Sequence, residues 1–558
     1  MPAERPTRDC VPNLESYDDE RARFDLAPGE RFNPVVDIVE RWAADDPDAL
    51  ALLSLDAEGA VTARHTVAEL AVEARRAAAA FARLGIGKGD AIFLMLPRVP
   101  AWYAALLGAV RIGAIPMPGP NLLTAKDIAY RTASADAVAV VVDAPGATKV
   151  DDVIGDLPSV RHKICWSPYG EVPAGWTGFD ELTADASTDG LPDDPTASTD
   201  PMLIYFTSGT VAQPKMVLHT QASLSLGHVI TARYWHDLRP GDLHWTISDT
   251  GWAKAAWGKL FGQWYQRATV VQMDMGKPDA ATIFGVLQDQ GITSFCAPPT
   301  LYRMLVLADL GAYDFSALRH CTSAGEPLNP EVIKVWAEGT GLTVYDGYGQ
   351  TETTNIVANY RTVPVRPGSM GRPAPGYDVD VRDDDGGDVP VGEVGNVCVR
   401  AEPRPLGLFR EYYRDPEATA DCFRNGWYFT GDKARKDADG YLWFEGRSDD
   451  VITSSAYRIG PFEVESALVE HPAVAEAAVV GKDDPQRTQI VTAFVILVPG
   501  RTGSPELAQE LQDFAKQQTA PYKYPRAIYF VDELPKTVSG KIRRTELRDW
   551  LREGRFGA

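Results

Sequence analysis

The sequence predicts an α/β protein with a large N-terminal domain, made of two α/β subdomains and a β subdomain, and a small, mobile α+β C-terminal domain. At 558 residues the chain is longer than one ordinary domain. In its first half, helical patterns alternate with short, fully apolar strand patterns, as in parallel sheets covered by helices on both faces. A stretch typical of antiparallel hairpins follows, and a compact unit ends the chain.

The first α/β subdomain is predicted from a repeated cycle of helix, glycine and strand. Residues 66–84 are strong helix formers, and Gly85 is suited to end that helix. A continuous apolar run at 91–96 predicts a buried strand, the segment 100–118 repeats the cycle, and 136–145 carries another buried-strand pattern. Crossover units of this kind favour a mainly parallel sheet.

The rest of the chain divides into three parts. A second α/β stretch covers about 203–324, and residues 381–400 have the turn residues and alternation of antiparallel hairpins. We predict an N-terminal domain over 1–446, a hinge at 447–450, and a C-terminal domain over 451–558 with helices at 460–470 and 505–518. A small domain on a short polar segment is expected to move relative to the large one.

Charge and composition exclude several function classes. The formal net charge of −22 repels nucleic-acid backbones and anionic lipid, so neither partner is expected. No apolar run reaches the roughly 18 residues of a membrane span, and the N-terminus lacks an apolar leader pattern. The six cysteines are scattered without metal-ligand spacing, which is typical of reduced, structural cysteines. Together these features predict a cytoplasmic protein.

The segment YFTSGTVAQPKMV, residues 205–217, has the composition of a phosphate-holding loop. It carries small hydroxyl residues, a glycine and Lys215, but it lacks the spacing of a Walker loop, so an ordinary P-loop nucleotidase is disfavoured. Taken alone, such a loop is a turn more often than a phosphate site. A second segment, YDGYGQTET at 345–353, combines glycines with hydroxyl groups and a carboxylate, and its plain alternative is a tight turn between strands.

Seven motifs in a fixed order remove much of this ambiguity. They are YFTSGT..QPKMV, SAGEPLNPEV, YGQTET, WYFTGD, GRSDD, YRIGPFEVE and LPKTVSGKIRR. In this order the chain resembles the adenylate-forming superfamily of acyl- and aryl-CoA synthetases, adenylation domains of peptide synthetases and luciferases. The segments DTGWAKAAWGKLFGQW and SSAYRIGPFEVESALVEHPAV look most like medium-chain acyl-CoA synthetases.

The resemblance implies an acid–thiol ligase that joins a small-molecule carboxylic acid to CoA through an acyl-adenylate, with ATP or acyl-AMP, CoA and Mg²⁺ as ligands. The residues it assigns to the nucleotide are Thr207, Ser208, Gly209, Thr210, Glu326, Asp346, Gly347, Tyr348, Thr351, Asp432 and Arg447. Those it assigns to catalysis are Lys541, Lys215, Glu352 and Arg458, with Glu352 also holding the metal. Asp449 falls on the hinge position, and Ser455, Ala456 and Tyr457 fall on the CoA channel.

For the acid itself, the medium-chain branch implies Trp235, Lys254 and Trp257. Lys254 and Trp257 are three residues apart, so a helix would present them on one face. The alternative is that the whole GWAKAAWGKLFGQW segment is an amphipathic core helix.

Two positions depart from the family pattern. Val211 and Ala212 replace a threonine and a glycine in the phosphate loop, which removes one hydroxyl donor and adds strain wherever the glycine position has a positive φ. Ala456 replaces a glycine beside the CoA channel and adds a methyl group there.

Several alternatives therefore stay open at this stage. The first is a complete ATP-dependent synthetase, and the second is an enzyme with weak adenylation that acts mainly on preformed acyl-AMP, supplied by a separate adenylating enzyme. A ligase that loads a carrier protein and a non-catalytic acyl-AMP-binding protein are the others.

Overall fold

The predicted crossover units build a five-stranded parallel sheet at the N-terminal end of the molecule. The computed structural model describes residues 5–193, 195–207, 213–447, 450–454, 457–519, 522–537 and 541–556. The strands of this sheet, in spatial order, are β4 (Ile115–Pro118), β3 (Ala91–Met95), β5 (Ala139–Asp143), β6 (His162–Trp166) and β7 (Thr177–Gly178). The helices of this region are α3 (Val67–Arg83), α4 (Pro100–Arg111), α5 (Ala125–Ser134), α6 (Ala144–Asp151) and α7 (Phe179–Ala184), with a 3₁₀ turn η2 (Ile154–Asp156).

The first predicted helix begins and ends where its capping residues stand. The side chain of Thr66 accepts from Glu69 N while the Glu69 carboxylate accepts from Thr66 N, which satisfies free N–H groups at the start of α3. Gly85 follows the helix with φ +74°, the left-handed region that glycine adopts readily. The alanine-rich face of α3 packs closely on α4, where a Cβ at Gly108 would lie 2.6 Å from the Ala77 Cβ.

The second α/β unit is a nine-stranded mixed sheet. Its strands, in spatial order, are β16 (Arg372–Pro373), β15 (Asn355–Ala358), β14 (Val344–Gly349), β13 (His320–Ala324), β12 (Ser294–Ala297), β10 (Leu243–Thr246), β11 (Thr269–Met273), β1 (Leu50–Leu55) and β2 (Val61–Thr66). The six consecutive strands from β14 to β1 in this order run parallel to one another.

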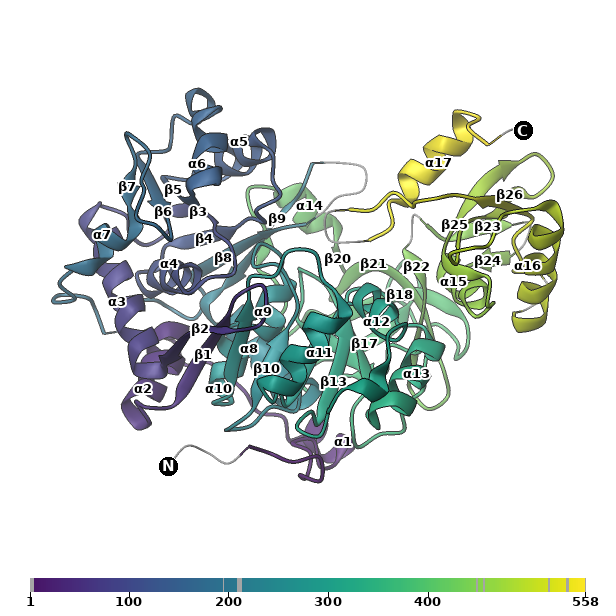
Figure 1. Cartoon of the computed structure of the whole chain (residues 1–558), viewed down its shortest axis with the longest axis horizontal. Coiled ribbons are helices and arrows are strands. Elements are labelled where there is room, and N and C mark those ends of the chain that lie inside the picture. The colour runs from purple at the N-terminus through teal and green to yellow at the C-terminus, as the bar shows by residue number, and fades with distance from the viewer. Residues whose placement is uncertain are drawn as a thin grey trace.

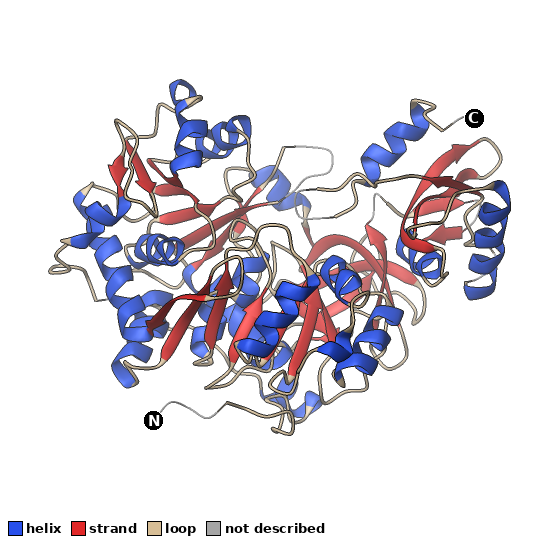
Figure 2. Ribbon diagram, viewed as in Figure 1, coloured by secondary structure: helices blue, strands red, loops and turns tan. Residues whose placement is uncertain are grey.

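The helical segments between these strands are short. They are α8 (Gln221–Ile230), the π-helix η3 (Thr231–Trp235), α9 (Lys254–Gly258), α10 (Phe261–Tyr265), α11 (Ala280–Asp289), α12 (Pro299–Leu305), η4 (Leu310–Ala312) and α13 (Pro330–Thr340). The N-terminal segment adds α1 (Tyr17–Arg23), η1 (Val35–Glu40) and α2 (Arg41–Asp45). Figure 2 shows these helices around the central strands.

Two smaller sheets complete the large domain. One contains β8 (Pro201–Phe206), β9 (Met216–Thr220) and β19 (Glu411–Tyr412), and the segment between β8 and β9 is the candidate phosphate loop. The other is the predicted hairpin region, with β17 (Val379–Arg382), β18 (Val394–Arg400), β20 (Phe423–Arg424), β21 (Trp427–Lys436) and β22 (Leu442–Arg447), and α14 (Pro416–Asp421) beside it. All the pairings in this second sheet are antiparallel, as predicted.

The small C-terminal domain has its own sheet and core. Its strands are β24 (Tyr457–Ile459), β23 (Ile452–Ser454), β26 (Thr488–Leu497), β25 (Val474–Asp484) and β27 (Ala527–Phe530), and its helices are α15 (Pro461–Val469), α16 (Pro505–Gln518) and α17 (Arg544–Arg552). In Figure 1 this domain lies at the right, and the yellow segment before α17 runs back toward the large domain. The predicted fold class is thus confirmed, while the bounds of the hinge remain a prediction.

Candidate active site

A cavity of about 310 Å³ opens at the carboxyl ends of the parallel strands in the nine-stranded sheet. Residues that line it follow β10 (Ile247 to Lys254), β12 (Pro298 to Thr300), β13 (Gly325 and Glu326) and β14 (Gln350 and Thr351). In parallel α/β sheets, ligands bind at this edge because the loops after the strands converge there. Arg98, Trp257, Phe206 at the end of β8, and Lys541 of the small domain also line it.

On one side of the cavity, Lys254 and Trp257 line the wall from the short helix α9. Lys254 Nζ donates to the Ala324 carbonyl at 2.7 Å, and dehydration of the ammonium group lowers the pKa of Lys254. The surrounding chain is two short helices, α9 and α10, and not one amphipathic core helix. The break lies at Lys259 and Leu260, which have non-helical backbone conformations. Gly258, the last residue of α9, packs against Thr246, where a Cβ would lie 1.8 Å from Thr246 Oγ1.

Trp235 supports Trp257 from behind. It is 1% exposed, and its ring packs edge-on against Trp257 with 5.9 Å between centroids. Both rings pack against glycines of β14, and a larger residue at either position would clash. A Cβ at Gly347 would lie 2.6 Å from Trp235, and one at Gly349 would lie 2.7 Å from Trp257. The tryptophans and the YDGYG motif are therefore packed as one unit.

Next to the cavity, Asp432 is the centre of a hydrogen-bonded cluster that includes the cavity residue Gln350. Its Oδ2 accepts from Tyr348 Oη and from Gln350 Nε2, both at 2.6 Å. Asp432 and Arg447 are direct cross-strand partners in the β21–β22 hairpin. Burial raises the pKa of Asp432, whereas the Arg447 charge and the two donors lower it. The predicted residues Tyr348, Asp432 and Arg447 are thus brought together.

Asp346 and Glu326 stand near the same cluster in different environments. Asp346 is buried and accepts from the backbone N–H groups of Leu328 at 3.2 Å and Gly347 at 3.1 Å. Its removal from water raises its pKa to about 7. Glu326 lines the cavity and forms an ion pair with Arg303 at 2.8 Å.

A third cluster lies at the base of the phosphate loop. Glu352 Oε1 accepts from Tyr412 Oη at 2.8 Å, and Lys215 Nζ lies 4.5 Å from the centre of the Tyr412 ring. Pairing of β19 with β9 brings these residues together, because Tyr412 is opposite Val217. Thr207 N donates to the Lys215 carbonyl at 3.0 Å, which closes the base of the loop.

Lys541 reaches the cavity from the small domain. Its backbone is hydrogen-bonded to Thr537: the N–H of Lys541 donates to Thr537 Oγ1 at 3.1 Å, and its carbonyl accepts from Thr537 N at 2.7 Å. Dehydration lowers the pKa of Lys541, while the carboxylates of Glu326 and Asp432 oppose that shift. One cavity thus combines a lysine from each domain, Lys254 and Lys541, with the loop after β14.

Comparison with known proteins agrees with this geometry. The model of the AMP-binding enzyme family matches residues 39–413, and the model of the AMP-binding enzyme C-terminal domain matches residues 463–541. The chain belongs to the family of AMP-binding enzymes.

Relatives of this AMP-binding enzyme are acyl-CoA synthetases. It is 41% identical to mouse acyl-coenzyme A synthetase ACSM3, mitochondrial, over 97% of this chain and 94% of the relative. It is 44% identical to the human ACSM4 enzyme over 94% of this chain and 92% of the relative. The family and these relatives make the chain an AMP-forming acid–thiol ligase, as the sequence motifs predict.

Solved structures of related ligases have the same fold. The anthranilate CoA ligase AuaEII in complex with anthranoyl-AMP matches with a TM-score of 0.85 and 31% identity, over 94% of this chain and 98% of that protein. The acyl-CoA synthetase of Brucella canis matches with a TM-score of 0.74 and 37% identity, over 97% and 99%. The match extends through both domains.

The expected cytoplasmic location is wrong. The mouse and human relatives are named mitochondrial enzymes, which points away from the cytoplasm. Scattered cysteines without metal-ligand spacing indicate a reducing environment, but they do not indicate which compartment provides it. Among the described residues, no helix combines the length and apolar character needed to cross a membrane.

Several predicted residues of the AMP-binding enzyme lie outside the described residues. These are Ser208, Gly209, Thr210, Val211 and Ala212 of the loop, the hinge residue Asp449, and Ser455 and Ala456 of the CoA channel. Tyr457 and Arg458 belong to β24, which pairs with β23, and their side chains lie outside the described part of the chain as well.

Sequence reasoning missed two residues that organise the site. Gln350 donates to Asp432 and accepts from Tyr428 at 3.1 Å, and Tyr412 joins Glu352 to Lys215. Gln350 is part of the YGQTET motif, so the motif could have indicated that Gln350 belongs to the site. Tyr412 had no such signal, because only the pairing of β19 with β9 brings it to the loop.

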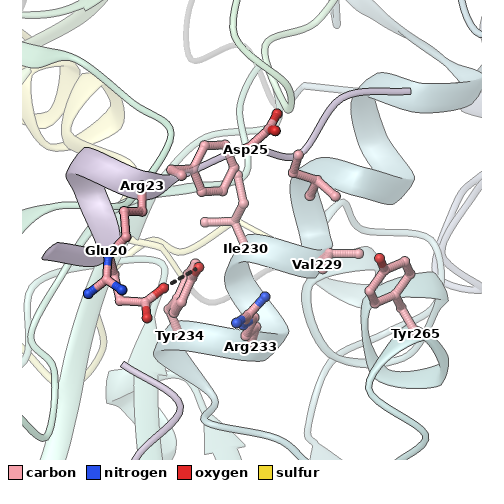
Figure 3. A pocket seen from close by; sticks show the side chains of 10 residues that line it. Glu20, Arg23, Asp25, Val229, Ile230, Arg233, Tyr234 and Tyr265 are labelled. Atoms are coloured by element: carbon pink, nitrogen blue, oxygen red, sulfur yellow. Dashed lines mark hydrogen bonds between the residues drawn. The ribbon is translucent and has the colours of Figure 1, made fainter. Parts of the chain in front are cut away.

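A second cavity, of about 210 Å³, lies on the outer side of η3, between this helix and the N-terminal segment. Its lining includes Glu20, Arg23 and Asp25 of that segment, and Figure 3 shows the Glu20 side chain pointing toward Tyr234. Tyr234 Oη donates to Glu20 Oε2 at 3.1 Å. The π-helix that carries Trp235 on its inner side is therefore anchored on its outer side by Tyr234.

Proposed function

We propose that this enzyme converts a carboxylic acid to its acyl-CoA thioester in two steps, through an acyl-adenylate. The observation that carries the proposal is the presence of Lys541 and Lys254 in one cavity with Thr351, beside the Asp432 cluster. Attack of a carboxylate on the α-phosphate brings several negative charges together, so the reaction needs fixed positive charge more than a proton acceptor.

In the first step, we assign the nucleotide to the side of the cavity at Gln350, whose side-chain amide donates to Asp432. The Asp432 carboxylate is suited to accept from ribose hydroxyls, with Arg447 opposite it, and such charge-assisted bonds are strong. We assign the adenine to Tyr348 and to Asp346–Gly347, with Glu326 at its border, and the phosphates to Thr207, Lys215 and Thr351. The carboxylate of the acid then lies between the phosphates and the wall formed by Lys254 and Trp257.

Glu352 is the residue that would hold Mg²⁺. Among the described residues, no group of three or more histidine, cysteine or acidic side chains could bind a metal by itself. One carboxylate at the base of the phosphate loop still fits this ion, because Mg²⁺ is commonly held by one or two carboxylates together with substrate phosphates. When bound, Mg²⁺ would neutralise phosphate charge, while Lys215 and Lys541 supply the protein's own positive charge.

In the second step, we propose that the small domain rotates about Asp449 and withdraws Lys541. The CoA thiol then attacks the acyl carbonyl, and AMP leaves. We assign Arg458 and residues 455–457 to the face of the small domain that meets CoA in the rotated state. CoA is the expected acceptor, because the relatives named above are acyl-coenzyme A synthetases.

A second candidate is favoured by the sequence of the phosphate loop. Val211 and Ala212 remove a hydroxyl donor and a glycine. Together these changes would slow adenylation by roughly 10² to 10⁴. The thioester step would be unaffected, because pyrophosphate has left before CoA attacks. In that case the enzyme acts mainly on preformed acyl-AMP.

A split assay on the purified full-length protein distinguishes these functions. Exchange of labelled pyrophosphate into ATP measures adenylation with a panel of acids, and synthetic acyl-AMP plus CoA measures the thioester step. Activity in both assays supports the complete synthetase. Thioester formation without exchange supports the second candidate, and Val211→Thr with Ala212→Gly should then restore exchange. Activity in neither assay would overturn the proposal.

A further inference from the structure

Histidines hold the backbone of both tryptophans at the acyl side. His320 Nε2 lies 2.7 Å from the carbonyl oxygen of Trp235, and His236 Nε2 lies 3.1 Å from that of Trp257. Both histidines are buried, at 2% and 0% exposure. None of the sequence motifs includes them, and neither lines the cavity.

The chemistry of these contacts fixes one tautomer of each ring. A carbonyl oxygen can only accept, so Nε2 must carry the hydrogen in both histidines. The Nδ1 atom of His236 is then free to accept from Thr322 Oγ1, which lies 3.0 Å away. Burial lowers the pKa of His320 to about 4 and that of His236 well below its usual value, so both rings stay neutral at physiological pH.

The contacts of Trp235 form a closed loop. The His320 ring stacks on the Tyr345 ring with centroids 4.8 Å apart, and the Tyr345 carbonyl accepts from Trp235 Nε1 at 3.1 Å. One stacked pair on the neighbouring strands β13 and β14 therefore holds Trp235 at its backbone and at its indole N–H. The carbonyl of Trp257 is held twice in a similar way, by His236 and by Gln263 Nε2 at 2.9 Å.

We propose that His320 and His236 are positioning residues that set the shape of the acyl site, and hence which acids it accepts, through the orientation of Trp235 and Trp257. The inference rests on the proposed function of the cavity. Because Trp235 supports Trp257 edge-on, a small rotation of either backbone segment moves the ring that lines the wall. The π-helix conformation of η3 agrees with a functional role, since π-helical turns are frequent at functional sites.

The chain contains a matched control on the nucleotide side. His219 is also buried, burial also lowers its pKa to about 4, and its Nε2 lies 2.8 Å from the carbonyl of Thr351. It thus makes the same bond with the same chemistry, but to the segment assigned to phosphate. Loss of the His219 bond should change KM for ATP, whereas loss of the His320 bond should change which acids the enzyme prefers.

The experiment compares His320→Phe, His236→Phe and His219→Phe with the corresponding glutamine variants. Phenylalanine keeps a ring without the donor, and glutamine keeps a donor without the ring. For each variant that retains cooperative unfolding, KM for the acid, KM for ATP and kcat are measured over a series of straight-chain and aromatic acids. We expect His320→Phe and His236→Phe to change the acid preference by roughly tenfold, the equivalent of one buried hydrogen bond, with KM for ATP unchanged.

For His219→Phe we expect the reverse, a higher KM for ATP with the acid preference of the wild type. Glutamine at 320 should restore part of the original preference. The inference is overturned if folded His320 and His236 variants keep the wild-type preference, or if all three phenylalanine variants change the same parameter. Wild-type protein without acyl-CoA synthesis would overturn the proposed function itself, so the two failures are distinguishable.

Discussion

The acyl side and the nucleotide side of the cavity are stabilised in different ways. On the acyl side, Trp235 and Trp257 are buried, packed on glycines of β14 and held by neutral histidines. On the nucleotide side, His219 holds the Thr351 carbonyl in the same way, but the groups that we assign to the nucleotide include Asp432, Lys215 and Arg447, and the last two are exposed to solvent. We expect the wall that we assign to the acid to be formed before substrate binds, whereas the side that we assign to the nucleotide presents charge that a polyphosphate would complete. We therefore expect the first to respond to changes in packing and protonation, and the second to changes in charge.

The largest effect is expected on the free energy of unfolding when the pH is lowered. Five buried histidines around the nine-stranded sheet and the active site have pKa values below the usual value because burial disfavours their charged form; they are His219, His228, His236, His244 and His320. Their contribution to the free energy of unfolding is present above about pH 6.5 and is lost as the pH falls toward 4, by about 1.4 kcal/mol per histidine and pH unit. Burial raises the pKa of Asp346 to about 7, so its protonation stabilises the folded state as the pH falls and offsets the loss from one histidine.

Denaturant unfolding followed by tryptophan fluorescence between pH 7.5 and 5 would measure this loss. We expect a decrease of several kcal/mol, and a smaller decrease in the His244→Phe variant, which removes one titrating group. A free energy of unfolding that is constant over this pH range would contradict the conclusion that these five histidines are held in their neutral form.

The next largest effect should follow removal of Lys541. Lys541→Ala removes the charge that the small domain brings to the cavity, and we expect pyrophosphate exchange to fall by about 10² to 10³. The thioester step from acyl-AMP should stay within a few fold of wild type. Lys536→Ala is the matched control, because this nearby lysine pairs with Glu476 at 2.8 Å inside the small domain. An equal loss in both half-reactions would contradict the assigned role.

A smaller effect is expected for Asp432→Asn. The amide loses the charge that we assign to ribose binding, so KM for ATP should rise by about 10- to 100-fold while KM for the acid stays unchanged. Asp437→Asn in the same hairpin is a suitable control, because Asp437 binds Arg366 at 2.6 Å and Trp443 at 3.0 Å. If Asp432→Asn changed the acid preference instead, the two sides would not be separate.

The smallest effect should come from Lys215→Ala. This lysine is exposed, so its interaction with phosphate is partly screened by solvent, and we expect about a two- to fivefold rise in KM for ATP. The rise should shrink in high salt, since screening weakens exposed charge pairs. Lys334→Ala, an exposed lysine on α13, provides the comparison. A complete loss of adenylation would show that Lys215 has a larger role than its exposure indicates.

The two sides of the cavity also differ in how well their residues could be predicted from the sequence. Motif residues such as Asp432, Tyr348 and Glu352 belong to short polar patterns, and in the structure Tyr348 donates to Asp432 while Tyr412 donates to Glu352. The acyl wall depends instead on which strands are neighbours. His320 and Trp235 are 85 residues apart, and their hydrogen bond exists because β13 and η3 lie against each other. A pattern of isolated histidines carries no information about that order, so the sequence assigned them no role.

Hydrogen exchange on the whole enzyme tests the comparison most directly. Backbone amides would be followed without ligand and with a non-reactive acyl-adenylate analogue. We predict that residues 231–236 and 255–264 are already protected without ligand and change little, whereas residues 345–353 and 430–447 gain protection on binding. Rapid exchange in 231–236 and 255–264 without ligand, with protection only after binding, would contradict a preformed acyl wall.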